Sequence, residues 1–195
     1  MKPLVVIAST NPVKAEKVRE LYFRNKPDIE HDMVLIYNGD TPYDRADMYT
    51  VNDRVAKDIG MYHEVVGKID RPFYFFMNED IVHVEGNEWL KHALGKGTEL
   101  VGVQPNISSF IPLEMIEAVG GRNHPCVRWG NHTVYVRTSA FACTRDYFFR
   151  LWRICEGVAG VFEKSTIAYT RNYSLFDDPF YICDSNSWPY RKYMR

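Results

Sequence analysis

The stretch Phe73-Tyr-Phe-Phe-Met-Asn-Glu-Asp-Ile81 is the strongest indication of the fold. Its first five residues are all apolar or aromatic, which is typical of a central strand that is buried on both faces. The run ends in three polar residues, Asn78, Glu79 and Asp80. In open α/β sheets, ligands bind beyond the carboxyl ends of the strands, so this acidic cluster predicts a binding site at that edge.

The chain before this strand alternates between strand and helix. Leu4 to Ala8 is rich in β-branched residues and predicts a first strand, and Val13 to Arg24 predicts a helix that begins after a turn containing Pro12. Met33 to Tyr37 predicts a second buried strand. Strand, helix and strand in this order favour a parallel βαβ unit.

The remaining elements are mixed. A helix is expected over Asp53 to Met61, followed by a short strand over Glu64 to Gly67. We therefore predict a single α/β domain over residues 1–195, with a mixed, mainly parallel central sheet flanked by helices. Residues 1–82 would form a nucleotide-binding half, and residues 83–195 an acceptor half.

Composition narrows the possible functions. The formal net charge of −1 gives no reason to expect nucleic acid as a partner. No apolar run approaches the roughly 20 residues of a membrane span, and the opening Met-Lys-Pro-Leu-Val-Val-Ile-Ala predicts a strand rather than a signal peptide. The four cysteines are widely spaced, which favours free thiols in a reducing compartment. We expect a cytoplasmic protein with no membrane anchor in this chain.

The acidic cluster after the buried strand resembles the metal-binding motif of GT-A glycosyltransferases, which use nucleotide-diphosphate sugars. The first acid of that acid-x-acid motif is Asn78 here, and the last is Asp80. Carboxylates at this place suit Mn²⁺ or Mg²⁺, and such a cation suits a diphosphate. The resemblance implies Asp80 as metal ligand, with Glu79 in support and Asp184 as a further candidate.

The same resemblance implies positions for the donor. The turn after the first strand and the acid after the second would hold the nucleoside, a cation before the central strand would meet the diphosphate, and Asn78 would meet the ribose. The residues at these places are Ala8, Ser9, Thr10, Asp40 and Arg54. Turn chemistry alone also explains Asp40, because Asn-Gly-Asp is a strong turn sequence, and Arg54 also fits a solvated helix face.

The sequence gives less specific indications of the catalytic and acceptor-binding residues. Asp80 and Glu79 would act through the cation, and an inverting reaction would need a carboxylate base such as Asp178. No carboxylate stands out as that base, so a reaction that retains the configuration of the anomeric carbon is preferred. Sugars stack on aromatic rings, which makes Trp129 and Trp188, together with His132, candidates for acceptor binding. A surface or core role is the alternative for each.

In its size and general sequence character, the chain also resembles the small glycosyltransferases encoded by large algal (chlorella) DNA viruses. Such enzymes decorate capsid protein in the host cytoplasm, so the expected reaction transfers a hexose or deoxyhexose, for example from UDP-glucose, to a hydroxyl of a glycan or glycoprotein.

Two alternative functions remain. Ala8-Ser-Thr-Asn-Pro-Val-Lys14 resembles the first phosphate-binding loop of inosine/xanthosine triphosphatases, in which Lys14 would grip a phosphate. The second alternative is a non-catalytic sugar-binding module.

Overall fold

The structure is a computed structural model that describes residues 2–50, 57–103, 105–108, 133–166, 170–175 and 182–184. Its centre is a seven-stranded sheet with the strand order β10-β6-β9-β4-β1-β2-β3. All neighbouring strands pair in parallel except β9, which is antiparallel to both β4 and β6. The strands are β1 (Leu4–Ser9), β2 (Asp32–Tyr37), β3 (Met48–Tyr49), β4 (Phe73–Asn78), β6 (Leu100–Gly102), β9 (Ala140–Thr144) and β10 (Tyr173–Leu175).

Strand β4 is buried on both faces, as its apolar run predicts. Tyr74 and Phe76 point into one hydrophobic core, and Phe75 and Met77 point into the other. This alternation follows from the two-residue period of a strand. The sheet therefore separates two cores, and β4 contributes aromatic side chains to both.

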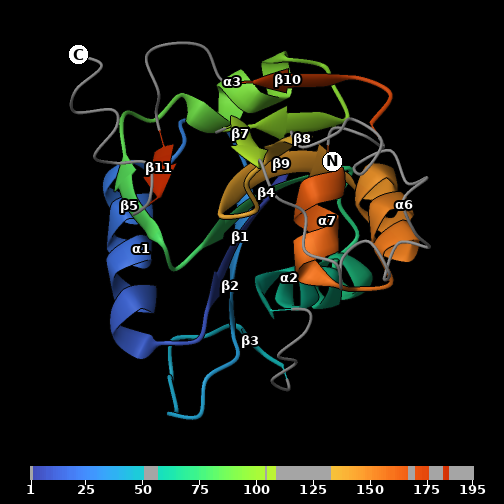
Figure 1. Cartoon of the computed structure of the whole chain (residues 1–195). Coiled ribbons are helices and arrows are strands. Elements are labelled where there is room, and N and C mark those ends of the chain that lie inside the picture. Colours follow the sequence, from blue (N-terminus) through green and yellow to red (C-terminus); the bar gives the residue numbers. More distant parts are fainter. Residues whose placement is uncertain are drawn as a thin grey trace.

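Helices cover both faces of the sheet. Helices α1 (Pro12–Arg24) and α3 (Trp89–Gly95) pack on one face, and α2 (Lys57–Lys68), α6 (Arg145–Cys155) and α7 (Ala159–Ser165) pack on the other. Figure 1 shows α1 on one side of the central strands and α2 and α7 on the opposite side. Helix α1 begins where the sequence predicts, because the Asn11 side chain accepts hydrogen bonds from the backbone N–H groups of Val13 and Lys14.

The short strand expected over Glu64 to Gly67 is wrong, because these residues belong to α2. The adjacent valines Val65 and Val66 favour a strand by propensity. However, Ile59, Tyr62 and Val66 recur at the spacing of one helical face, and all three are fully buried against the sheet. Burial of this face outweighs the local preference of the two valines.

Two small antiparallel ribbons complete the described chain. Strand β5 (Ile81–Val84) pairs with β11 (Ile182–Asp184), and β7 (Pro105–Ser108) pairs with β8 (Thr133–Val136). Strand β5 follows β4 directly, so Glu79 and Asp80 form the turn between them. No helix within the described ranges combines the length and the apolar character needed to cross a membrane.

The loops that follow β1 and β2 touch at Gly39. A Cβ atom at Gly39 would lie 2.2 Å from the carbonyl oxygen of Thr10 and 2.2 Å from the hydroxyl of Tyr37. We expect Gly39→Ala to lower the free energy of unfolding by about 2 kcal/mol, as overpacking does. Chemical denaturation measures this, with Gly67→Ala as the matched control, since a Cβ there meets nothing within 4 Å. Equal stability of Gly39→Ala and the parent would contradict the close approach.

Candidate functional site

A cavity of about 330 Å³ opens at the carboxyl ends of β1, β2 and β4 and at the start of α2. It lies where the sequence predicts a binding site, because parallel strands present their carboxyl ends at one edge of the sheet. The lining residues are Ala8, Ser9, Thr10, Asn38, Lys57, Asp58, Met61, Asn78, Glu79 and Asp80. Of these, Ala8, Ser9, Thr10, Asn78, Glu79 and Asp80 are predicted site residues, whereas Asp58 is not.

Asn78 connects Asp58 and Asp80, two of the three acids that line this cavity. Its side-chain amide donates to Oδ2 of Asp58 at 3.0 Å, and its Oδ1 accepts from the backbone N–H of Asp80 at 3.0 Å. Its backbone N–H donates to the carbonyl of Ser139 on the approach to β9. Asn78 therefore fixes the start of α2 relative to the turn after β4. An aspartate at this position would place a second charge beside Asp58, so the departure from the acid-x-acid motif has a physical reason here.

Glu79 turns toward β1 and holds the loop that follows it. Its Oε2 accepts from the Ser9 hydroxyl at 2.7 Å and from the backbone N–H groups of Thr10 and Asn11 at 2.7 and 3.1 Å. Burial alone would raise the pKa of Glu79, but these hydrogen bonds and the Lys14 ammonium outweigh burial and hold the pKa below its ordinary value. Glu79 therefore stays ionised and is already occupied by protein donors.

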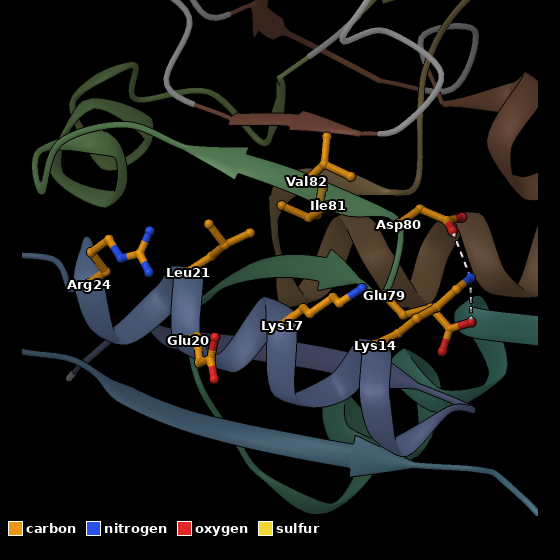
Figure 2. Close-up of a pocket in the computed structure, with 9 residues that line it drawn as sticks. All are labelled: Lys14, Lys17, Glu20, Leu21, Arg24, Glu79, Asp80, Ile81 and Val82. Atoms are coloured by element: carbon orange, nitrogen blue, oxygen red, sulfur yellow. Dashed lines mark hydrogen bonds and ion pairs between the residues drawn. The ribbon is translucent and has the colours of Figure 1, made fainter.

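Lys14 joins the two acids of the turn. Its Nζ lies 3.3 Å from Oε1 of Glu79 and 3.5 Å from Oδ1 of Asp80 (Figure 2). Burial alone would lower the pKa of Lys14, but the two carboxylates outweigh burial and raise it. The lysine thus carries its charge to the edge of the cavity, from the first turn of α1.

Asp58 is the functional candidate that sequence reasoning missed. Burial raises the pKa of its carboxyl to about 6, the hydrogen bond from Asn78 opposes this rise, and the negative charge of Glu163 adds to it. A carboxyl with a perturbed pKa in a cavity is typical of functional sites. Beside it, Lys57 adopts a left-handed backbone conformation with φ of 47°, which is uncommon for a residue other than glycine. The sequence indicates Lys57, together with Arg54, as a cation that could meet a diphosphate, but a helix expected to begin at Asp53 gives no signal for a buried acid at position 58.

Because the pKa of Asp58 is raised, a neutral side chain at this position should increase the free energy of unfolding by an amount that depends on pH. The folded protein favours the protonated carboxyl, so this contribution to stability is full below the ordinary pKa of about 3.9 and is lost as the pH rises through about 6. We expect Asp58→Asn to match the parent near pH 4 and to exceed its free energy of unfolding by roughly 2 kcal/mol at pH 8. Urea denaturation at both pH values measures this, with the exposed Asp44→Asn as control. A gain that does not depend on pH would contradict the assignment.

Other predicted site residues lie elsewhere or outside the described chain. Asp40 is exposed, directly after Gly39, and is not among the residues that line the cavity. The backbone of Asp184 lies in β11, but its side chain falls outside the described residues. Outside them as well lie Arg54, Trp129, His132, Asp178 and Trp188.

The donor set of the cavity fits a hard divalent cation. Within the described residues, no group of three or more His, Cys, Asp and Glu side chains is placed to hold a metal. Asp80 and Asp58 nonetheless line the same cavity. Magnesium-type sites commonly use one or two carboxylates and take their other ligands from water and substrate phosphates. Two carboxylates beside an open cavity meet that requirement. The Asp80 carboxylate would then contact both the cation and the ammonium of Lys14.

The arrangement defines a class of fold: an open, mainly parallel sheet with helices on both faces and a polar cavity at the strand ends. Comparison with solved structures finds this fold in residues 1–349 of TarS from S. aureus. The TM-score is 0.53 at 12% sequence identity, and the match covers 100% of this chain and 63% of that chain. This chain therefore resembles the GT-A domain of TarS, a glycosyltransferase, which confirms the predicted fold class.

The likeness is one of structure alone. The sequence matches no protein-family model and none of the curated proteins searched. The chain also spans less than two thirds of the TarS chain that it matches, at 63% of its length. Donor, acceptor and metal are therefore argued from this chain's own residues.

Proposed function

We propose that this protein is a metal-dependent glycosyltransferase that moves a sugar from a nucleotide-diphosphate sugar, in the first instance a UDP-sugar, to a hydroxyl of a glycan or glycoprotein. The observation that carries the proposal is the cavity at the carboxyl ends of β1 and β4 of a GT-A-like sheet, which Asp58, Asp80 and Lys57 all line. Carboxylates for a cation and a lysine for a phosphate are the groups that a diphosphate requires.

Each charged residue of the cavity has a role in this proposal. Asp80 holds the cation, with Asp58 as its partner across the cavity. Bound Mn²⁺ or Mg²⁺ would neutralise the diphosphate and stabilise the charge that develops on the leaving nucleoside diphosphate. Lys57 contacts the diphosphate from the start of α2, and the loop after β1 holds the nucleoside. Glu79 keeps that loop in place and is not itself the metal ligand.

A thermal-shift screen of nucleotides with and without metal tests the proposal. A ligand that binds only the folded state raises the melting temperature, by an amount set by its concentration relative to its Kd. We expect UDP with Mn²⁺ to stabilise the protein more than UDP or Mn²⁺ alone. Stabilisation by ITP with Mg²⁺, and none by UDP with Mn²⁺, would instead favour the triphosphatase alternative.

Lys14 separates these two enzyme classes. In a triphosphatase Lys14 grips a phosphate, so Lys14→Ala should remove activity. In the proposed transferase the lysine pairs with Glu79 and Asp80, and it is half exposed. A pair of this kind contributes roughly 0–1 kcal/mol. We therefore expect Lys14→Ala to change UDP-sugar turnover less than about tenfold. Loss of ITP hydrolysis in this variant, with no turnover of any UDP-sugar by the parent, would reverse the assignment.

A further inference from the structure

A second cavity lies beside the first, between α1 and β5, with a volume of about 420 Å³. The two cavities share Glu79 and Asp80, the two acids of the turn after β4. A molecule in this groove would therefore reach the same turn after β4 that the donor site uses. In a transferase, the second substrate must approach the reacting sugar from a space that is continuous with the donor site, and the groove meets this condition.

The helix side of the groove is a row of cations. Lys14, Lys17 and Arg24 line it from α1, and their spacing of three and seven residues places them along one helical face. The row spans about 15 Å, at about 1.5 Å per residue. Figure 2 shows Arg24 at the end of the row far from Asp80, with Leu21 between Arg24 and Lys17. Lys14 is paired with Glu79 and Asp80, whereas Lys17 and Arg24 have no ion-pair partner within the described part of the chain.

The opposite side of the groove is apolar. Ile81 and Val82 line it from β5, and the Val82 side chain is exposed although it is hydrophobic. Glu20 is the one further acid among the lining residues, and Figure 2 shows its carboxylate directed away from β5. A ligand that fits this groove would therefore carry negative charge on one side and an apolar face, such as the C–H face of a sugar ring, on the other.

We propose that this groove binds the acceptor, and that the acceptor is an anionic sugar whose phosphate or carboxylate group meets Lys17 and Arg24. That the bound sugar is an acceptor rests on the proposed function. That the groove binds an anion depends only on the residues of the groove. Leu21 and the exposed Val82 take the apolar face of the ring, whereas Ile81, which is 2% exposed, belongs to the core. The sugar hydroxyl nearest to Asp80 is the one that reacts: its oxygen bonds to the anomeric carbon of the donor sugar as the bond from that carbon to the diphosphate breaks, and its proton passes to the released nucleoside diphosphate.

The test is a titration followed by ¹H–¹⁵N NMR, with glucose 6-phosphate, glucuronate and glucose as probes. We expect at least one of the two anionic sugars to shift the amide signals of Lys17, Leu21, Arg24, Ile81 and Val82 at millimolar concentration, and glucose to leave them unchanged. The double variant K17E/R24E should weaken this binding at least tenfold. The matched control K26E/K68E makes the same charge change at exposed lysines outside the groove and should bind as the parent does.

Each alternative outcome is decisive. Equal shifts with glucose and the anionic sugars, no shifts with any of the three, or equal binding by the parent and K17E/R24E would overturn the proposal. Both double variants must keep the dispersed spectrum of the folded parent, and if K17E/R24E does not, K17Q/R24Q takes its place. Titrating the parent with UDP and Mn²⁺ tests the donor site separately. Binding of an anionic sugar without any response to nucleotides would support the groove and refute the transferase assignment.

Discussion

Replacing Asp80 with asparagine is expected to lower sugar transfer by on the order of a thousandfold, which corresponds to about 4 kcal/mol of transition-state stabilisation. The carboxylate stands at the turn after β4, where it lines both cavities. Asparagine keeps the shape of the side chain but removes the charge that a divalent cation requires. The fold should survive, because the Asp80 side chain is 44% exposed and lies 3.5 Å from the flexible ammonium of Lys14.

Two measurements check this expectation. Turnover of a panel of UDP-sugars at saturating Mn²⁺ gives the loss of activity, and the melting temperature with UDP and increasing Mn²⁺ gives the loss of metal-dependent binding. Asp44→Asn makes the same chemical change at an exposed loop residue and should match the parent in both. An Asp80→Asn protein that binds UDP with Mn²⁺ as tightly as the parent would show that the metal assignment is wrong.

Glu79→Ala is expected to lower the free energy of unfolding by about 3 kcal/mol and to abolish nucleotide binding. The alanine leaves the Ser9 hydroxyl and the backbone N–H groups of Thr10 and Asn11 without their acceptor. The buried Ser9 hydroxyl that loses a charged acceptor loses more than the net value of a neutral hydrogen bond, whereas water can replace the acceptor for the N–H groups of the exposed Thr10 and Asn11. The loop after β1 would then no longer present a fixed surface to the nucleoside.

The pH dependence of the same variant distinguishes the carboxylate from simple packing. Because the folded state holds the pKa of Glu79 below its ordinary value, its contribution is present above about pH 4.3 and is lost as the pH falls through the folded pKa. The stability difference between parent and variant should therefore shrink in acid. Glu64→Ala, which removes only a surface pair with Lys68, is the control and should cost less than about 1 kcal/mol. A difference that stays constant down to pH 3 would refute the role of the charge.

Much of the site could be predicted because local sequence controls where strands end. The apolar run from Phe73 to Met77 identifies the central strand, and the parallel βαβ start brings Ser9 and Thr10 to the same edge as Asp80. These inferences need only the periods of helix and strand. They do not depend on which elements pack against each other.

What could not be predicted depends on tertiary contacts. Asp58 enters the site because Asn78 hydrogen-bonds to it from a different element, and the true length of α2 is set by burial against the sheet. Glu79 and Asp80 are adjacent acids of similar chemistry, so the sequence alone does not say which one turns toward β1. The groove between α1 and β5 was also missed, because the apolar pair Ile81 and Val82 gives no sign that it faces a row of cations.

The position of β9 has a consequence for the order in which the protein is made. Strand β4 pairs with β1 on one edge and with β9 on the other, and β9 begins only at Ala140. On a growing chain, therefore, the aromatic strand Phe73 to Met77 is synthesised long before the partner that covers its second edge. An unpaired edge of this composition is a template for aggregation. Fragments that end before Ala140 should accordingly precipitate, and synthesis in the cell should depend on chaperone protection of β4 until β9 leaves the ribosome.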